Sequence, residues 1–157
     1  MSTLIVYYSM GGNTEYAAKK IAERTGADLL RLEPVKAYPA SGIRKFLWGG
    51  KSAVMAEKPA LQPYQFDADK YETVIFGFPV WASNIAPPIR TFISENTLKA
   101  SRYAAFACQG GAGAEKAFSR LKECLGHGLD KTLVLIDPKD RPDPAKDLQI
   151  EEFCDSL

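Results

Sequence analysis

The sequence predicts a doubly wound α/β fold: a five-stranded parallel sheet, in the strand order 2-1-3-4-5, with helices on both faces. Apolar runs of strand length alternate five times with segments of helical spacing, a pattern typical of parallel sheets with right-handed crossovers. Three of the strand-to-helix loops have unusual sequences, and this strand order would place all three at one edge of the sheet. We therefore expect a ligand at that edge.

Length and composition indicate one globular domain, residues 1–157, because 46% of the 157 residues are apolar and can form a packed core. Its 20 basic residues oppose 19 acidic ones, for a net charge of +1, and no basic block suggests nucleic-acid binding. No run of about 18 apolar residues occurs, so we expect no membrane contact and a soluble, cytoplasmic protein. Cys108, Cys124 and Cys154 are odd in number and widely spaced, which suits a reducing compartment.

The first unusual loop lies between a predicted strand, Leu4–Tyr8, and a predicted helix of about Asn13–Arg24 with Gly26 as its cap. It reads Ser9-Met10-Gly11-Gly12-Asn13-Thr14. The adjacent glycines let successive backbone N–H groups point into one concavity, and hydroxyl and amide side chains add donors. This chemistry suits a monophosphate held without lysine or arginine, whereas the spacings of triphosphate and dinucleotide loops are absent. The alternative is that Asn13 and Thr14 are ordinary helix N-cap residues and the glycines form a tight turn.

The remaining elements continue the alternation. Strands are predicted at Ala27–Leu32, Tyr71–Phe78, Tyr103–Cys108 and Thr132–Ile136; one helix opens at Ala86-Pro87-Pro88, another runs through Ala117–Leu125, and the last covers about Ala145–Ser156. Residues Val35–Asp69 form a long surface excursion with a helix within Ser41–Ala56, and loops of this length tend to be functional. Its aromatic residues Tyr38, Phe46 and Trp48 either pack the excursion onto the body or cover a ligand or partner.

Two further loops complete the expected ligand edge. The loop Pro79-Val80-Trp81-Ala82-Ser83-Asn84 follows the third strand and presents an indole. Because a tryptophan in a loop at the end of a strand is badly placed for the core, we expect Trp81 to be exposed for ligand contact, with core packing as the alternative. The loop Gln109-Gly110-Gly111-Ala112-Gly113 follows the fourth strand, and its glycines allow close backbone approach to a ligand.

On these residues the sequence resembles the flavodoxin family over essentially its whole length. Residues Tyr8–Thr14 are similar to the family's FMN phosphate loop, Gly77–Trp81 to its isoalloxazine loop, and Ala107–Gly111 stand where the family has a third flavin loop. The resemblance implies a flavodoxin-like fold that binds one FMN noncovalently. It implies that the phosphate is held by the first loop, Ser9, Met10, Gly11, Gly12, Asn13 and Thr14. It also implies that Trp81 lies against the flavin ring, in a pocket shaped by Pro79, Val80, Ala82, Ser83 and Asn84. The polar edge of the ring would be contacted by Gln109, Gly110 and Gly111.

Three functions are compatible with this resemblance. The leading prediction is an FMN-dependent oxidoreductase passing electrons from NAD(P)H to a quinone-like acceptor, because a net charge of +1 departs from the strongly acidic flavodoxins that carry electrons. The long excursion also resembles the substrate walls of flavodoxin-like reductases. The alternatives are an electron-transfer flavoprotein with a redox partner protein, and a flavin-free interaction module. Aromatic residues of the excursion would either cap the flavin or join two copies in a homodimer.

We predict no catalytic acid or base and no set of metal ligands, because the bound cofactor would supply the chemistry. His127 is the only histidine, and the usual zinc-ligand spacings are absent. We expect His127 to end the helix that runs through Leu125, where a cation suits the helix dipole. Cys108 is expected to be a small buried hydrophobe, with a redox role beside the flavin as the alternative.

Overall fold

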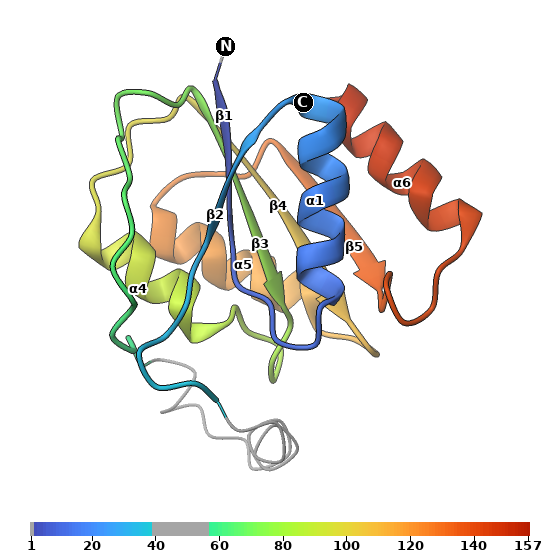
Figure 1. Ribbon diagram of the computed structural model, residues 1–157, viewed down its shortest axis with the longest axis horizontal. Helices are drawn as coiled ribbons and strands as arrows, with labels where there is room; N and C mark the ends of the chain where they lie inside the picture. Colours follow the sequence, from blue (N-terminus) through green and yellow to red (C-terminus); the bar gives the residue numbers. More distant parts are fainter. Residues whose placement is uncertain (1, 39–56) are drawn as a thin grey trace.

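The computed structural model describes residues 2–38 and 57–157 (Figure 1). Five parallel strands form one sheet in the order β2-β1-β3-β4-β5, so the predicted fold class and strand order are confirmed. The elements are β1 (Thr3–Tyr7), α1 (Asn13–Thr25), β2 (Asp28–Arg31), β3 (Thr73–Pro79), α4 (Pro87–Glu95), β4 (Arg102–Gln109), α5 (Ala114–Leu125), β5 (Lys131–Ile136) and α6 (Pro144–Asp155). The helix expected within Ser41–Ala56 lies outside the described residues.

Several element ends agree with the sequence signals that predicted them. Gly26 caps α1 at a positive φ of 73° and donates its N–H to the carbonyl of Ala22 at 2.8 Å. Two prolines open α4, where their missing N–H groups cost no helical hydrogen bond. The third strand begins at Thr73 rather than at Tyr71, because its pairing with both neighbours starts there. Within the described ranges no helix is long and apolar enough to cross a membrane.

Helices cover both faces of the sheet (Figure 1). Successive strand residues point to opposite faces, so Val6 and Phe76 pack with α4 and α5, whereas Ile5 and Ile75 pack with α1 and α6. The central strands are buried on both faces, which explains their nearly continuous apolar sequences.

The parallel arrangement brings the ends of β1, β3, β4 and β5 to one edge of the sheet. The loops that lead from these strands into α1, α4, α5 and α6 all lie along that edge, at the lower side of the view in Figure 1. Doubly wound sheets bind their ligands at this carboxyl edge. The fold therefore positions the three unusual loops together, as the strand order predicted.

Candidate functional site

The candidate site is the group of loops at the carboxyl edge, and several contacts hold these loops together. The loops after β3 and β4 meet where Ser83 packs on Gly113: a Cβ built on Gly113 would lie 2.8 Å from Ser83 Oγ. The loops after β4 and β5 meet where the Asp137 carboxylate lies beside Gly110, 3.7 Å from a Cβ built there. The loop after β5 reaches the start of α1 through Asn13, which completes the chain of contacts.

The first loop leaves a set of backbone donors unused. Within the part of the chain that the structure describes, no acceptor pairs with the backbone N–H groups of Gly11, Gly12, Asn13 and Thr14. The next two groups are bonded, since Glu15 N–H donates to Ser9 Oγ at 3.1 Å and Tyr16 N–H donates to the Gly12 carbonyl at 3.0 Å. Free N–H groups at the positive end of a helix form an anion site. The loop geometry thus fits the phosphate that the sequence predicted there.

Gly12 is the residue on which this loop geometry depends. Its φ is +93°, in the left-handed region that residues with a Cβ rarely adopt. Ser9 and Thr14, which flank the loop, are almost fully buried and polar. Because Ser9 Oγ already accepts from Glu15, its hydroxyl hydrogen is the part that can still be donated to a ligand.

The side chain of Asn13 makes a different contact from the one expected. Its Oδ1 accepts hydrogen bonds from the backbone N–H groups of Lys139 at 2.9 Å and Asp140 at 3.2 Å, and its Nδ2 donates to Asp140 Oδ2 at 3.1 Å. The Asn13 side chain therefore ties the loop between β5 and α6 to the start of α1, and its backbone N–H is what it offers to a phosphate. This contact could not be predicted from local sequence patterns, because the partners are 126 and 127 positions apart.

A basic residue that sequence reasoning missed supports the first loop from β2. Arg31 donates from Nη2 to the carbonyl of Ser9 at 3.2 Å, and it forms ion pairs with Glu15 and Glu33. The guanidinium also lies over the ring of Tyr7, 6.0 Å from its centroid. Arg31 thus fixes the backbone of the loop while its own charge is balanced by two carboxylates.

The expectation that Trp81 is exposed is wrong. Only 5% of its surface is accessible, and its indole belongs to the core on the α4–α5 face. The indole packs edge-on against Tyr8 and Tyr38, with ring centroids 5.7 and 5.3 Å away. Edge-to-face packing of this kind is a favoured arrangement of aromatic rings. Contact between Trp81 and a flavin stays a prediction.

A tight turn directs Trp81 toward this core. Trp81 N–H donates to the Asn84 carbonyl at 3.2 Å and Asn84 N–H donates to the Trp81 carbonyl at 2.9 Å, with Ala82 and Ser83 between them at φ 50° and 61°. Positive φ at both central residues defines a type I′ turn, which normally carries Asn-Gly. Non-glycine residues held there store strain, which concentrates at functional sites.

Hydrogen bonds from side chains and from the backbone hold the rest of the second and third loops in place. Asn84 Oδ1 accepts from the N–H of Ile85 at 2.8 Å and from Arg90 Nη2 at 3.3 Å. Val80 N–H donates to the Cys108 carbonyl at 2.9 Å, so the loop after β3 continues to pair with β4. Gln109 Oε1 accepts from Ala114 N–H at 3.0 Å and caps α5. The side chain of Gln109 is thereby engaged, and its loop offers backbone groups to a ligand.

A depression of about 520 Å³ lies between the second and third loops. Its lining includes Ser83 from the second loop and Gln109, Gly111 and Gly113 from the third. Of the other predicted residues, Met10 lies in the first loop and Gly110 in the third, whereas Pro79 is the last residue of β3, directly before the second loop. The structure thus places all the predicted site residues at one edge, with a hollow between two of their loops.

Burial raises the pKa of three titratable groups at this edge. Desolvation raises the pKa of the Tyr8 and Tyr38 hydroxyls to about 12. It also raises the pKa of the Cys108 thiol to about 12, against a smaller opposing effect of a hydrogen bond with Thr14. Cys108 is thus the small buried group that the sequence predicted. Within the described ranges, no cluster of His, Cys, Asp and Glu could hold a metal ion.

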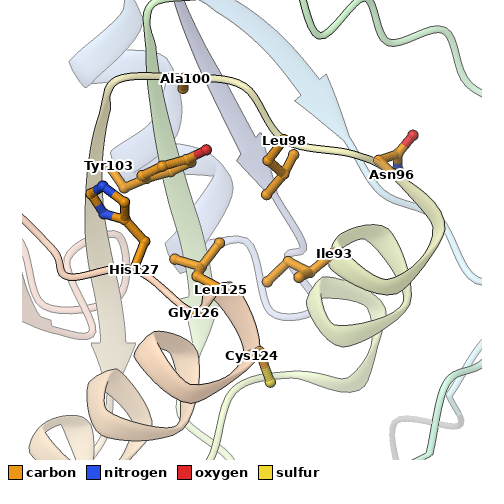
Figure 2. Close-up of a pocket in the computed structure, with 9 residues that line it drawn as sticks. All are labelled: Ile93, Asn96, Leu98, Ala100, Tyr103, Cys124, Leu125, Gly126 and His127. Carbon is orange, nitrogen blue, oxygen red and sulfur yellow. The ribbon is translucent and has the colours of Figure 1, made fainter.

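A second depression, of about 290 Å³, lies at the opposite edge of the sheet, near the C-terminal ends of α4 and α5 (Figure 2). His127 lines it but does not end the helix as expected, because α5 stops at Leu125 and Gly126 forms its cap. The imidazole instead packs on Tyr103, with ring centroids 4.8 Å apart, and its Nδ1 lies 2.7 Å from the Gly128 carbonyl oxygen. None of the three unusual loops contributes to this depression.

The fold and the loops define a doubly wound α/β protein in which, among the described residues, backbone N–H groups without acceptors lie at the carboxyl edge of the sheet. Comparison with known proteins then gives the family. The chain matches the sequence model of the family described as Flavodoxin over residues 2–140. It belongs to the flavodoxin family.

Solved structures agree with this assignment at the level of the fold. A candidate flavoprotein from Bacteroides uniformis ATCC 8492 is 24% identical, covers 96% of each chain and has a TM-score of 0.80. A flavoprotein from Lactobacillus acidophilus NCFM in complex with FMN is 21% identical over 97% of each chain, with a TM-score of 0.70. An NAD(P)H:quinone oxidoreductase from Methanothermobacter marburgensis is more distant: it is 12% identical over 99% of this chain and 94% of that chain, with a TM-score of 0.56.

Proposed function

We propose that this chain binds one FMN at the carboxyl edge of the sheet and acts as an oxidoreductase that passes electrons from NAD(P)H to a quinone-like acceptor. FMN, when bound, supplies reversible transfer of one or two electrons. The chain supplies binding, orientation and the surroundings of the ring. Family membership and the FMN held by the Lactobacillus acidophilus protein support the choice of flavin.

The observation that carries the proposal is the set of free backbone N–H groups from Gly11 to Thr14 at the start of α1. Four donors at the positive end of a 13-residue helix match the oxygens of one phosphate. The buried hydroxyls of Ser9 and Thr14 add donors at the same place. A monophosphate needs no metal ion and no triphosphate motif to bind there.

The second and third loops would hold the ring. Ser83, Gln109 and Gly111 would line one side through backbone and hydroxyl groups, since they border the depression, and Gly110 lies between the last two in the chain. Pro79, Val80, Ala82 and Asn84 would shape the wall. Trp81 offers a ligand very little surface in this conformation, so stacking on the flavin would require its aromatic neighbours to move.

The choice of an oxidoreductase over an electron carrier rests on charge and on resemblance. The net charge of this chain is +1. By contrast, the flavodoxins that it resembles and that carry electrons at low potential are strongly acidic. A near-neutral surface gives little electrostatic steering toward a basic protein partner. The structural likeness to an NAD(P)H:quinone oxidoreductase, at 12% identity, shows that this chain shares the fold of such an enzyme. The nucleotide and quinone substrates are proposed here.

The cofactor is tested by titrating the purified protein with FMN and recording the visible spectrum after unbound ligand is removed. Retained flavin absorbance supports the proposal, and a protein that retains none contradicts it. Gly12→Ala should abolish retention. Gly26→Ala is the matched control, because Gly26 also has a positive φ but lies at the other end of α1 with open space around it. Both variants should lose similar stability, and only Gly12→Ala should lose FMN.

The reaction is tested by following oxidation of NADH and of NADPH by the FMN-loaded protein with a soluble benzoquinone. Turnover that depends on both donor and quinone supports the oxidoreductase. A loaded protein that oxidises neither nucleotide, yet accepts electrons from a flavodoxin reductase, would instead be the electron carrier.

A further inference from the structure

The loop between β5 and α6 brings a lysine to the phosphate loop. Asn13 holds the backbone of Lys139 and Asp140, and the Lys139 side chain then crosses Gly12. A Cβ built on Gly12 would lie 2.8 Å from Lys139 Nζ and 3.2 Å from its Cδ. The lysine reaches the loop because Gly12 has no side chain. The ammonium group therefore lies beside the free N–H groups described above.

This position is electrostatically unfavourable for a lysine in the ligand-free protein. The start of a helix carries a partial positive charge, so a cation is repelled there and an anion is attracted. Lys139 forms no ion pair with any residue in the described ranges. A bound anion would remove the repulsion, because it would interact with the ammonium group and the helix N-terminus together.

The acidic groups nearby are already engaged. The Asp140 carboxylate accepts from Asn13 Nδ2 at 3.1 Å, and Glu15 forms ion pairs with Lys19 and Arg31. Asp137 lies 3.9 Å from Arg141 and faces Gly110 in the third loop. Among the basic residues that the structure describes near this loop, Lys139 is therefore the one that stays available for a ligand.

We propose that Lys139 is a phosphate-binding residue of the site and makes it selective for FMN over riboflavin. The inference rests on the proposed function, because it adds a charged contact to the same FMN site. It differs from the sequence prediction, in which the phosphate is held without lysine or arginine. Lys139 comes from the fifth strand's loop rather than from any of the three loops that the sequence singled out.

The experiment measures dissociation constants for FMN and for riboflavin, which lacks the phosphate, by fluorescence titration at low and high salt. The variants are Lys139→Met, Lys139→Arg and Lys122→Met. Lys122 is the matched control, because it is exposed near the end of α5, close to the opposite edge, and its removal changes the net charge equally. Thermal unfolding of each variant shows that it is folded.

Lys139→Met should weaken FMN binding about three- to tenfold, the range of one charge-assisted contact near the surface. Riboflavin binding should not change, and the salt dependence of FMN binding should become shallower. Lys139→Arg should keep most of the affinity, and Lys122→Met should behave as the wild type.

Three results would overturn the inference. If Lys139→Met binds FMN as tightly as the wild type, with the same salt dependence, Lys139 is no phosphate ligand and the proposed function stands. If FMN and riboflavin weaken equally, the lysine only supports the loop. If the wild type binds no FMN at all, the proposed function and this inference fail together. Where riboflavin binds too weakly to titrate, the salt dependence of FMN binding decides.

Discussion

The ring of Phe106 lies directly over the Cα of Gly77. The two residues are register partners on neighbouring strands, and a Cβ built on Gly77 would come within 2.1 Å of Phe106 Cζ. On the face of the sheet that packs against α1 and α6, the Phe106 ring of β4 therefore occupies the space that a side chain at Gly77 would fill. Gly77 is two residues before the end of β3, so this contact lies close to the start of the second loop.

We expect Gly77→Ala to lower the free energy of unfolding by about 1–3 kcal/mol, the usual cost of overpacking a filled core. The Phe106 ring cannot stay in place when a methyl group is added beneath it. Urea denaturation measures the change. Gly128→Ala is the control, since Gly128 has open space around it and no positive φ, and its effect should stay within about 0.5 kcal/mol. Equal effects of the two substitutions would contradict the close approach of Phe106.

The turn between Trp81 and Asn84 is strained, so a substitution that relieves the strain should raise the free energy of unfolding, whereas Gly77→Ala should lower it. Ser83 has a φ of 61°, which glycine adopts without cost. Ser83→Gly should therefore raise the free energy of unfolding of the ligand-free protein by about 1 kcal/mol. Ser119→Gly, an exposed change within α5, should instead destabilise by about 0.5 kcal/mol. A destabilised Ser83→Gly variant would argue that the left-handed conformation carries no strain.

The buried thiol of Cys108 makes stability depend on pH in the alkaline range. Burial raises its pKa from 9.0 to about 12, so the folded protein keeps the neutral thiol where the unfolded chain ionises. The stabilisation is complete below pH 9 and is lost progressively as the pH rises toward 12. We expect a loss of about 1 kcal/mol between pH 9 and 10 from this group alone.

Urea midpoints at pH 8, 9 and 10 test this pH dependence. Cys108→Ala should flatten the decline over that range, whatever its effect on absolute stability. Cys124→Ala is the control for removing a thiol at a position that is only partly buried. If the Cys108→Ala and wild-type profiles stay parallel, the thiol titrates normally in the folded protein.

The fold could be predicted because its signals are local and repeat along the chain. Each central strand is a short apolar run, such as the one around Ile75, and each is followed by a loop and a segment with helical spacing. Once the alternation is recognised, the parallel sheet follows from physical rules of connection. The three loops could be placed at one edge for the same reason, without knowing any side-chain contact.

The details of the site could not be predicted, because they depend on contacts between distant residues. The direction of the Trp81 side chain is set by the turn through Ala82 and Ser83, which lacks the Asn-Gly sequence that predicts such turns. Lys139 reaches Gly12 only because the Asn13 side chain holds the loop after β5, and nothing in the sequence near either residue indicates the contact. Sequence patterns thus identified the loops but not the direction of their side chains.

Trp81 gives the sharpest test of the described core. Its indole packs among buried apolar residues and two tyrosine rings, so Trp81→Ala should lower the free energy of unfolding by about 3–5 kcal/mol. Trp81→Phe keeps an aromatic ring and should cost clearly less, so it remains measurable if the alanine variant does not fold. Leu148→Ala is the control: Leu148 is a large apolar residue of α6 that is 54% exposed, and its loss should change stability by no more than about 0.5 kcal/mol.

The same variants separate packing from ligand contact at Trp81. If the indole only fills the core, Trp81→Phe should bind FMN with unchanged affinity, because the backbone conformation of the loop after β3 stays the same. If the indole stacks on the flavin in the complex, Trp81→Phe should weaken FMN and riboflavin equally, since both ligands carry the ring. That pattern is distinct from the one expected for Lys139, where only the phosphate-bearing ligand is affected. A Trp81→Ala variant as stable as the wild type would show instead that the indole lies outside the core.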